Sequence, residues 1–373
     1  MNYQAAVVTE RGKVQVESFP MPELDSRDML VKVELAGVCG TDVHLLNSEK
    51  PFPWEEQQYP FRLGHEWVGI IEKMGDSFPR TDMFGEPIQE GDRIVCYPST
   101  WACGTCYACK VLLQPNLCMR PPFPRDLPNM GSAFSEYIYI PEGSTVYRIP
   151  DNVSSRAAVL VEPFAGALRA FERSFLPGVP DRYQGMGPGK SVVVMGSGTI
   201  GTLMVILAKL AGASPIIVVG GPKGRLELCK KFGADITIDI TDTTREERIE
   251  TVLSHTIHRL GADAVFECAG APSAFIDGIQ VTRMGGSLVE FGHYTDRGTI
   301  PINPLDVCRK DIQILGSWGY GQQEFASVVR ILAANSGKIP FEDVVTHSFA
   351  LQEIQDALEI ARKQDCTKAV IQF

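Results

Sequence analysis

The sequence has no excess of positive charge. Its 35 lysines and arginines are outnumbered by 45 aspartates and glutamates, so the 373-residue chain has a formal net charge of −10. It also has no long basic block, which argues against nucleic acid or an anionic membrane surface as the main partner. A small-molecule partner remains open.

Signals for export and membrane insertion are also missing. The first residues show no basic segment followed by an apolar one, so we expect no signal peptide and a cytoplasmic location. One uncharged run, residues 191–208, has the length of a membrane span, but Gly196, Gly198 and Gly201 interrupt it. A buried strand followed by a helix explains this run better. Internal repeats and low-complexity segments are lacking.

The sequence pattern changes near residue 163, and the chain is long enough for about two domains. Before that point, short alternating runs such as residues 30–35 and 134–140 are separated by Gly, Pro and Asp turns, which is typical of β structure. After it, strand and helix patterns alternate, which indicates a parallel sheet covered on both faces. The sequence therefore predicts an α/β protein with a β-rich domain and a doubly wound domain.

A G-x-G-x-x-G motif lies between a predicted buried strand and a helix. Gly196 permits a tight turn, Gly198 lets the backbone approach a pyrophosphate, and Gly201 lets the helix pack on the strand. A helix is predicted from Ile200 with its N-terminus directed at the anion, and Thr199 and Ile200 are candidate cofactor contacts. The motif predicts a dinucleotide site; the alternative is a glycine-rich turn in another kind of α/β domain.

The acid that usually ends the second strand of such a unit is absent. In NAD-binding proteins this acid binds the ribose hydroxyls. Here Gly220 and Gly221 take its place, followed by Lys223 and Arg225. Either cation could pair with a 2′-phosphate, or both could be solvated loop charges. The sequence therefore permits NADP as well as NAD.

Four of the ten cysteines lie close together. Cys103, Cys106, Cys109 and Cys118 fall in a loop of about residues 96–120 that is rich in Pro and Gly. Ten cysteines in a chain of this length do not indicate a disulfide framework. Four thiolates at this spacing suit a closed, tetrahedral structural zinc site. Iron–sulfur ligation, or a free or oxidised cluster, is the alternative.

A second set of candidate ligands is dispersed along the chain. It comprises Cys39, the neighbours His65 and Glu66, and Glu162. One thiolate, one imidazole and one or two carboxylates could hold a catalytic zinc that keeps a position open for substrate or water. Taken singly, each residue is ambiguous, because an isolated cysteine is usually a core residue and a Gly-His-Glu sequence is often only a turn.

Taken together, these motifs resemble the zinc-dependent medium-chain dehydrogenase/reductase superfamily, of the alcohol, sorbitol and threonine dehydrogenase type. The resemblance extends from about Ala6 to Phe373 and follows the family's order of motifs. That ordered set is more specific than any single motif. Its members are residues 39–44, 64–66, 91–94, 103–118, 162–163, 196–201 and 267–270.

The resemblance implies a GroES-like β-rich catalytic domain and a Rossmann domain with a doubly wound parallel sheet, with the active site in the cleft between them. The catalytic domain would comprise residues 1–163 and 305–373, and the Rossmann domain residues 164–304. Two zinc ions per chain, one catalytic and one structural, and NAD or NADP are the implied cofactors. The family also implies a homodimer or homotetramer formed through the Rossmann domains, with residues 299–304 as a candidate edge.

The resemblance also assigns roles at the dispersed site. Cys39, His65 and Glu162 would ligate the catalytic zinc, and Glu66 would bind it or exchange with water beside it. Asp42 would orient His65.

Further roles implied by the resemblance concern the proton, the cofactor and the substrate. Thr41 would accept the alcohol proton, and His44 would relay it through the cofactor ribose to solvent, since histidine exchanges protons near neutral pH. The expected additional cofactor contacts are Cys268, Gly292 and His293, and the expected substrate contacts are Trp54, Phe61 and Trp318.

The predicted activity is zinc-dependent hydride transfer between an alcohol or polyol and NAD(P). The alternatives are a zinc-independent quinone or enone reductase and a non-catalytic dinucleotide-binding protein of the same fold. Three features depart from the family pattern: the spacing between Cys109 and Cys118 is one residue longer, the segment 76–90 is longer, and the acid is missing at Gly220. The residues do not choose between a polyol, a simple secondary alcohol and an amino alcohol.

Overall fold

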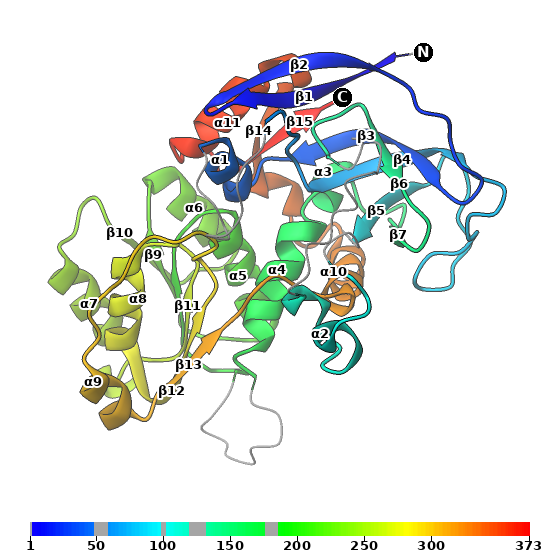
Figure 1. Ribbon diagram of the computed structural model, residues 1–373. Coiled ribbons are helices and arrows are strands. Elements are labelled where there is room, and N and C mark those ends of the chain that lie inside the picture. The colour runs from blue at the N-terminus through cyan, green and yellow to red at the C-terminus, as the bar shows by residue number, and fades with distance from the viewer. Residues whose placement is uncertain (1, 48–58, 98–101, 119–131, 176–185) are drawn as a thin grey trace. The chain divides into compact units, whose positions relative to one another are not determined.

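The computed structural model describes residues 2–47, 59–97, 102–118, 132–175 and 186–373 (Figure 1). The chain divides into two compact units. The discontinuous unit comprises Met1–Ala165 and Tyr320–Phe373, and the continuous unit comprises Gly166–Gly319. No helix in the described part of the chain has the length and apolar character needed to cross a membrane.

The discontinuous unit is built on two sheets whose strands pair antiparallel, except that β14 and β15 are parallel. Strands β1 (Asn2–Glu10) and β2 (Lys13–Pro20) form a two-stranded sheet. A seven-stranded sheet has the order β14-β15-β3-β4-β5-β7, with β6 also paired to β3. Its strands are β3 (Met29–Gly37), β4 (Glu66–Met74), β5 (Arg93–Tyr97), β6 (Tyr137–Ile140), β7 (Thr145–Arg148), β14 (Val345–Ala350) and β15 (Lys368–Gln372).

The two ends of the chain meet at β3. On one side Gly37 pairs with Val370 of β15, and on the other side it pairs with Glu66 of β4. The last strand of the protein therefore lies beside the segment that follows β3. The helices of this unit are α1 (Gly40–Leu46), α2 (Tyr107–Lys110), α3 (Ser155–Ala158), α10 (Gln322–Asn335) and α11 (Ile354–Arg362), together with the first turn of α4 (Val161–Glu172).

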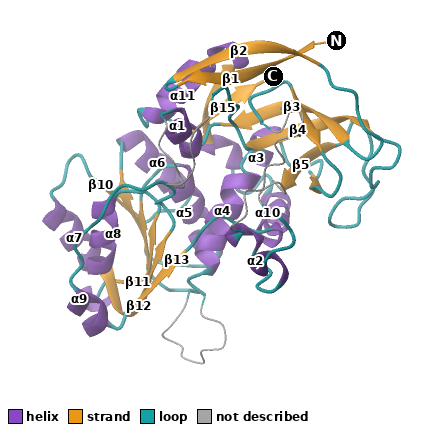
Figure 2. Ribbon diagram, viewed as in Figure 1, coloured by secondary structure: helices purple, strands orange, loops and turns teal. Residues whose placement is uncertain are grey.

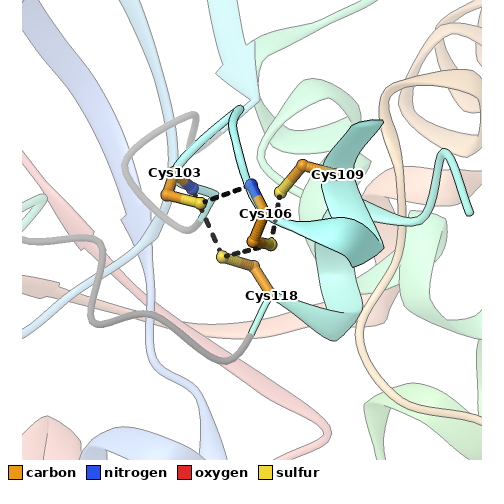
Figure 3. A group of neighbouring side chains, drawn as sticks. All are labelled: Cys103, Cys106, Cys109 and Cys118. Carbon is orange, nitrogen blue, oxygen red and sulfur yellow. Dashed lines mark hydrogen bonds between the residues drawn. The ribbon is translucent and has the colours of Figure 1, made fainter. Parts of the chain in front are cut away.

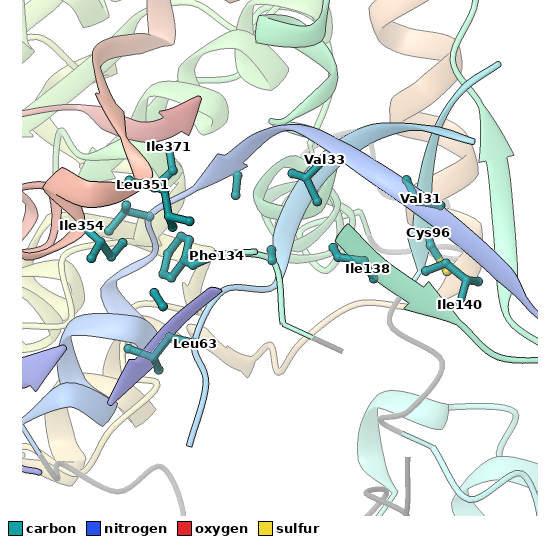
Figure 4. Close-up of a cluster of buried hydrophobic side chains, with 14 of the residues drawn as sticks. Val31, Val33, Leu63, Cys96, Phe134, Ile138, Ile140, Leu351, Ile354 and Ile371 are labelled. Carbon is teal, nitrogen blue, oxygen red and sulfur yellow. The ribbon is translucent and has the colours of Figure 1, made fainter. Parts of the chain in front are cut away.

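The core of the discontinuous unit contains side chains from both ends of the chain. Figure 4 shows Val31 and Val33 of β3 and Ile138 of β6 in the same cluster as Ile354 of α11 and Ile371 of β15. All five are at most 2% exposed. Burying a side chain of this size stabilises the fold by about 1.5–3 kcal/mol, so the C-terminal segment is an integral part of this unit.

The continuous unit is a Rossmann fold. Its six strands are all parallel and have the order β10-β9-β8-β11-β12-β13, which is 3-2-1-4-5-6 in chain order. The central strands are runs of fully buried apolar residues, as a sheet covered on both faces requires. The strands are β8 (Val192–Met195), β9 (Ile216–Gly220), β10 (Ile236–Asp239), β11 (Ala262–Glu267), β12 (Thr282–Glu290) and β13 (Gln313–Gly316).

Helices cover both faces of this parallel sheet, and the α/β class predicted from the sequence is confirmed. Figure 2 shows the alternation of strands and helices along this part of the chain. Helices α5 (Thr199–Leu210) and α6 (Lys223–Lys231) pack against each other. On the opposite face, α8 packs against α7 and α9. These three helices are α7 (Arg245–Ser254), α8 (Pro272–Val281) and α9 (Pro304–Lys310).

The division of the chain differs from the sequence-based boundary over residues 305–319. These residues lie in the continuous unit because β13 pairs with β12 as the sixth parallel strand. The four residues of β13 alternate between half-buried and exposed. This edge strand is short and half-exposed. It therefore lacks the run of apolar residues by which the central parallel strands are recognised in the sequence.

Candidate metal centres and cofactor site

The dispersed ligands Cys39, His65 and Glu66 converge at one end of the large antiparallel sheet. One ligand atom from each lies within 4.8 Å of the others. The strand pairing explains this: β3 and β4 are antiparallel, so the end of β3 lies beside the start of β4. Cys39 follows β3 as the N-cap of α1, and His65 directly precedes β4.

Glu162 lies beside His65. It comes from the first turn of α4, and its Oε1 is 3.9 Å from His65 Nε2. The Tyr320 hydroxyl donates a hydrogen bond to the same Oε1 at 2.5 Å. Both Glu162 and Tyr320 are buried. The structure thus brings together all four residues that the sequence singled out, and it adds Tyr320 as a donor that fixes one of the carboxylates.

Asp42 connects the two turns that carry Cys39 and His65. Its Oδ2 accepts a hydrogen bond from the Cys39 amide at 2.9 Å, and its Oδ1 accepts one from the Gly64 amide at 3.0 Å. His65 Nδ1 is 3.7 Å from the same Oδ1. Asp42 is 1% exposed. The side chain therefore fixes the backbone next to both ligands and places a negative charge behind the imidazole.

A buried ion pair at this site was not predicted. Lys368, the first residue of β15, lies with its Nζ 2.6 and 2.8 Å from the two carboxylate oxygens of Glu66, and it also donates to the Val38 carbonyl at 2.9 Å. Lys368 and Glu66 are both almost fully buried. Gly37 makes room for the pair, because a Cβ there would lie 2.1 Å from Glu66 Oε2. The signal in the sequence is a lysine directly before the apolar run of residues 369–371.

The electrostatics of this cluster fit a bound cation. Burial raises the pKa of Glu162 to about 7, and the neighbouring charge of Glu66 adds to the effect. Burial alone would lower the pKa of His65, but the Cys39 thiol and the Glu162 and Asp42 carboxyls raise it well above 6.5. One thiol, one imidazole and carboxylates are the donors of catalytic zinc sites. The donor set therefore fits zinc, whose charge would compensate the buried acids.

The four-cysteine loop forms a compact group of sulfur atoms (Figure 3). All four Sγ atoms lie within 4.8 Å of one another, and Cys106 Sγ is 3.5 Å from Cys109 Sγ and 3.7 Å from Cys118 Sγ. Four sulfurs bound to one zinc at about 2.3 Å lie about 3.8 Å apart, whereas a disulfide needs about 2.05 Å. The Cys103 amide donates to Cys118 Sγ, and the Cys106 amide donates to Cys103 Sγ, both at 3.3 Å. The arrangement fits a tetrahedral metal site.

The glycine motif adopts the conformation that its sequence predicted. Gly196 has φ of +112°, which favours glycine, and α5 begins directly after Gly198. A Cβ at Gly201 would lie 2.0 Å from the Gly196 carbonyl oxygen, so only glycine allows the helix to start so close to β8. Thr199 and Ile200 form the first turn of α5. Backbone amides at a helix N-terminus in this setting suit a pyrophosphate.

The other expected cofactor residues surround a pair of acids at the ends of β11 and β12. Glu267 accepts hydrogen bonds from the amides of Ala269 and Gly270, which directly follow Cys268 in the loop after β11. A Cβ at Gly292 would lie 2.2 Å from Glu267 Oε2. His293 Nδ1 lies 2.8 Å from Glu290 Oε1 and 3.5 Å from Glu267 Oε2. These contacts fix the two loops at the carboxyl ends of the strands, where ligands bind to such sheets.

Stability of the continuous unit should depend on pH through Glu267. Burial raises the pKa of Glu267 to about 8, and the Glu290 carboxyl adds to it. The fold therefore favours the protonated acid: its contribution is complete below the ordinary value of 4.5 and is lost as the pH rises to about 8. Glu267→Gln keeps an acceptor for the amides and a donor for Glu290. The difference in Tm between this variant and wild type should increase as the pH is raised from 5 to 8. Each kcal/mol of free energy of unfolding that wild type loses corresponds to about 2–4 °C.

Thermal unfolding followed by circular dichroism across this pH range tests the expectation. Glu246→Gln, at an exposed position of α7, is the matched control and should run parallel to wild type. If the curve of Tm against pH for Glu267→Gln also runs parallel to that of wild type, Glu267 is not the source of the pH dependence.

The remaining predicted residues are placed as follows. Thr41 Oγ1 is 3.5 Å from Cys39 Sγ, and His44 lies in the last turn of α1. Phe61 is partly buried against the core of the discontinuous unit, and Trp318 stacks on Tyr294 with ring centroids 4.6 Å apart in the continuous unit. Trp54 lies outside the described residues.

Known families match both parts of the chain. Residues 25–151 match the alcohol dehydrogenase GroES-like domain, and residues 199–334 match the zinc-binding dehydrogenase family. Two relatives are each 32% identical: 5-exo-hydroxycamphor dehydrogenase of Pseudomonas putida over 370 residues and sorbitol dehydrogenase of Bacillus subtilis (strain 168) over 372 residues. The alignments cover 99% of this chain in both cases, and 98% and 97% of the relatives.

Solved structures of similar proteins cover the whole chain. An alcohol dehydrogenase from Thermotoga maritima superposes with a TM-score of 0.87 at 26% identity, covering 100% of this chain and 99% of that one. A protein of Sinorhizobium meliloti 1021 with bound NADP superposes with a TM-score of 0.83 at 27% identity, covering both chains completely.

The chain therefore belongs to the zinc-dependent medium-chain dehydrogenase/reductase superfamily, as its motifs predicted. Membership identifies it as a zinc-binding dehydrogenase, an oxidoreductase of the alcohol dehydrogenase type.

Proposed function

We propose that the chain carries a catalytic and a structural zinc ion and transfers hydride between an alcohol or polyol and NAD(P). The observation that supports this proposal most directly is the convergence of Cys39, His65, Glu66 and Glu162 at one end of a sheet, with both carboxylates buried. A catalytic zinc supplies a Lewis acid for the alcohol or carbonyl oxygen, and the nicotinamide supplies the hydride acceptor or donor.

Cys39, His65 and Glu162 are the proposed ligands of the catalytic zinc, and Glu66 is the proposed auxiliary carboxylate. Both oxygens of Glu66 accept from Lys368, so this carboxylate already has a full positive charge as its partner. Glu162 receives one hydrogen bond from a neutral phenol and keeps the ability to ligate through its other oxygen. Cys103, Cys106, Cys109 and Cys118 are the proposed ligands of the structural zinc.

Thr41 and His44 are the proposed proton carriers. Thr41 lies two residues after Cys39, with its Oγ1 3.5 Å from the Cys39 Sγ, and its hydroxyl can accept the alcohol proton and donate its own. His44 follows on the same short helix, in its last turn, and would pass the proton onwards. Asp42, between them in sequence, holds the Cys39 turn in place and keeps the ligand geometry while protons move.

The substrate class rests on the relatives, which act on a hydroxylated terpenoid and on a sugar alcohol by their names. The two alternatives weighed from the sequence, a zinc-independent reductase and a non-catalytic binding protein, do not account for the buried donor set. A cytoplasmic location and a homodimer or homotetramer remain predictions. The exposed side chains of Ile302, Leu305 and Ile314, at and near the edge strand β13, support association through this edge.

Elemental analysis of the purified chain, combined with cofactor reduction at 340 nm, tests the proposal. We expect two zinc ions per chain and turnover on at least one member of a panel of secondary alcohols and polyols, with NAD or NADP. Glu162→Ala should lose turnover and one zinc, whereas Cys106→Ser should lose the other zinc. One zinc per chain together with no turnover on the panel would overturn the proposal.

A further inference from the structure

The acid missing at Gly220 cannot be accommodated there. Ser197, inside the glycine motif and 2% exposed, donates its hydroxyl to the Gly221 carbonyl and accepts from the Gly221 amide, both at 3.0 Å. A Cβ at Gly220 would lie 2.6 Å from Ser197 Oγ and 2.9 Å from Ser197 N. An aspartate at the end of β9 would therefore collide with the turn that binds the pyrophosphate.

A carboxylate is present one strand away. Asp239, the last residue of β10, is the parallel partner of Gly220, the last residue of β9. Neighbouring strands are about 4.8 Å apart, so the two strand ends lie side by side. Gly221 has no side chain to cover this acid: a Cβ there would lie 3.4 Å from Asp239 Oδ1.

Asp239 is held in position and ionised. The amide and hydroxyl of Thr241 donate to its Oδ1 at 2.9 and 2.7 Å. These hydrogen bonds, with a smaller contribution from Lys223, lower the pKa of Asp239. The hydrogen bonds that its carboxylate accepts from described residues end on Oδ1, so Oδ2 can accept a donor from a ligand.

The two nearby cations differ in position. Arg225 lies beside the motif, with its Nη1 3.9 Å from where a Cβ of Gly198 would be, which places it near the pyrophosphate position. Lys223 interacts with Asp239 and lowers its pKa. Lys223, at the start of α6, therefore lies within electrostatic reach of the Asp239 carboxylate.

From this arrangement, and resting on the dinucleotide-dependent function proposed above, we propose that Asp239 replaces the missing acid of β9. Its carboxylate accepts the hydroxyls of the adenosine ribose, compensates Lys223, and repels a 2′-phosphate. The chain therefore prefers NAD over NADP, although the second strand lacks the residue by which this preference is usually recognised.

Equilibrium binding to the zinc-loaded full chain tests the proposal without requiring turnover. Dissociation constants are measured by calorimetry for NAD and NADP, and for 5′-AMP and adenosine 2′,5′-bisphosphate as probes of the ribose end. Wild type should bind NAD at least about tenfold more tightly than NADP. Asp239→Asn retains the acceptor for Thr241 but loses the charge. This variant should weaken the binding of NAD by about tenfold or more, because a hydrogen bond to a charged group contributes about 1.5–3 kcal/mol. It should strengthen the binding of NADP.

Two further variants complete the experiment. Asp242→Asn makes the same change in net charge at an exposed position three residues on, and it should leave both constants unchanged. In the Asp239→Asn background, Lys223→Met should remove the gain in NADP binding.

Three results would overturn the assignment to Asp239: equal or tighter binding of NADP by wild type, an unchanged preference in Asp239→Asn, or an equal effect of Asp242→Asn. Binding of neither dinucleotide by the folded, zinc-loaded chain would instead overturn the dinucleotide-dependent function itself, and the inference with it.

Discussion

Replacing Lys368 by methionine is expected to lower the free energy of unfolding by about 3–5 kcal/mol, the cost of leaving one member of a buried ion pair without its partner. Glu66 would keep a charge in a fully buried position with both acceptor oxygens deprived of their donor. Methionine approximates the length of the lysine stem, so loss of packing contributes little. Urea unfolding of the purified chain, with zinc content determined on the same sample, measures the effect.

The matched controls separate charge from position. Lys368→Met combined with Glu66→Gln removes both charges and should recover much of the lost stability. Lys363→Met, at an exposed lysine just after α11, should change the free energy by less than about 0.5 kcal/mol. A loss below about 1 kcal/mol for Lys368→Met, with zinc retained, would contradict the importance of this pair.

Replacing Cys39 by serine is expected to lower kcat/KM by about three orders of magnitude. The reason is the loss of the thiolate from the proposed catalytic zinc site, where the metal contributes several kcal/mol to the barrier. Zinc content should fall by one ion per chain, because the four-cysteine site should keep its zinc ion. Steady-state kinetics and elemental analysis are done on the same preparation.

Cys308→Ser serves as the control for this experiment. Cys308 is an exposed cysteine on α9, far along the chain from all the proposed ligands, and its replacement should leave both zinc content and turnover unchanged. Full activity with two zinc ions in Cys39→Ser would exclude Cys39 as a ligand.

The fold could be predicted where local pattern and long-range structure agree. The parallel strands of the continuous unit are buried on both faces, so apolar runs such as Val192–Met195 identify them without knowledge of the fold. The edge strand Gln313–Gly316 is short and half-exposed, and its place in the sheet depends on pairing with Thr282–Glu290. Pairing of this kind leaves little trace in a single sequence.

The candidate site was predictable in its ligands and not in their partners. Cys39, His65 and Glu162 are each ambiguous alone, and they are proposed as ligands because the ordered set of motifs resembles the dehydrogenase family. Lys368 and Asp239 are common residue types. Lys368 gains its role from an ion pair with Glu66, 302 positions away in the sequence, and Asp239 from its pairing with Gly220 on the neighbouring strand. Only the register of β15 on β3 and of β10 on β9 assigns them to a site.

The pairing of β15 with β3 also sets an order of events during synthesis. The continuous unit, residues 166–319, is contiguous and can fold as soon as it has left the ribosome, as domains generally do. In the discontinuous unit, β6 can pair with residues 29–32 of β3 early, but residues 35–37 of β3 stay unpaired on that edge until residues 370–372 are made. Until Lys368 is made, Glu66 lacks this counter-charge, so the proposed catalytic centre is completed only after the continuous unit, although its first ligand, Cys39, precedes that unit in the chain.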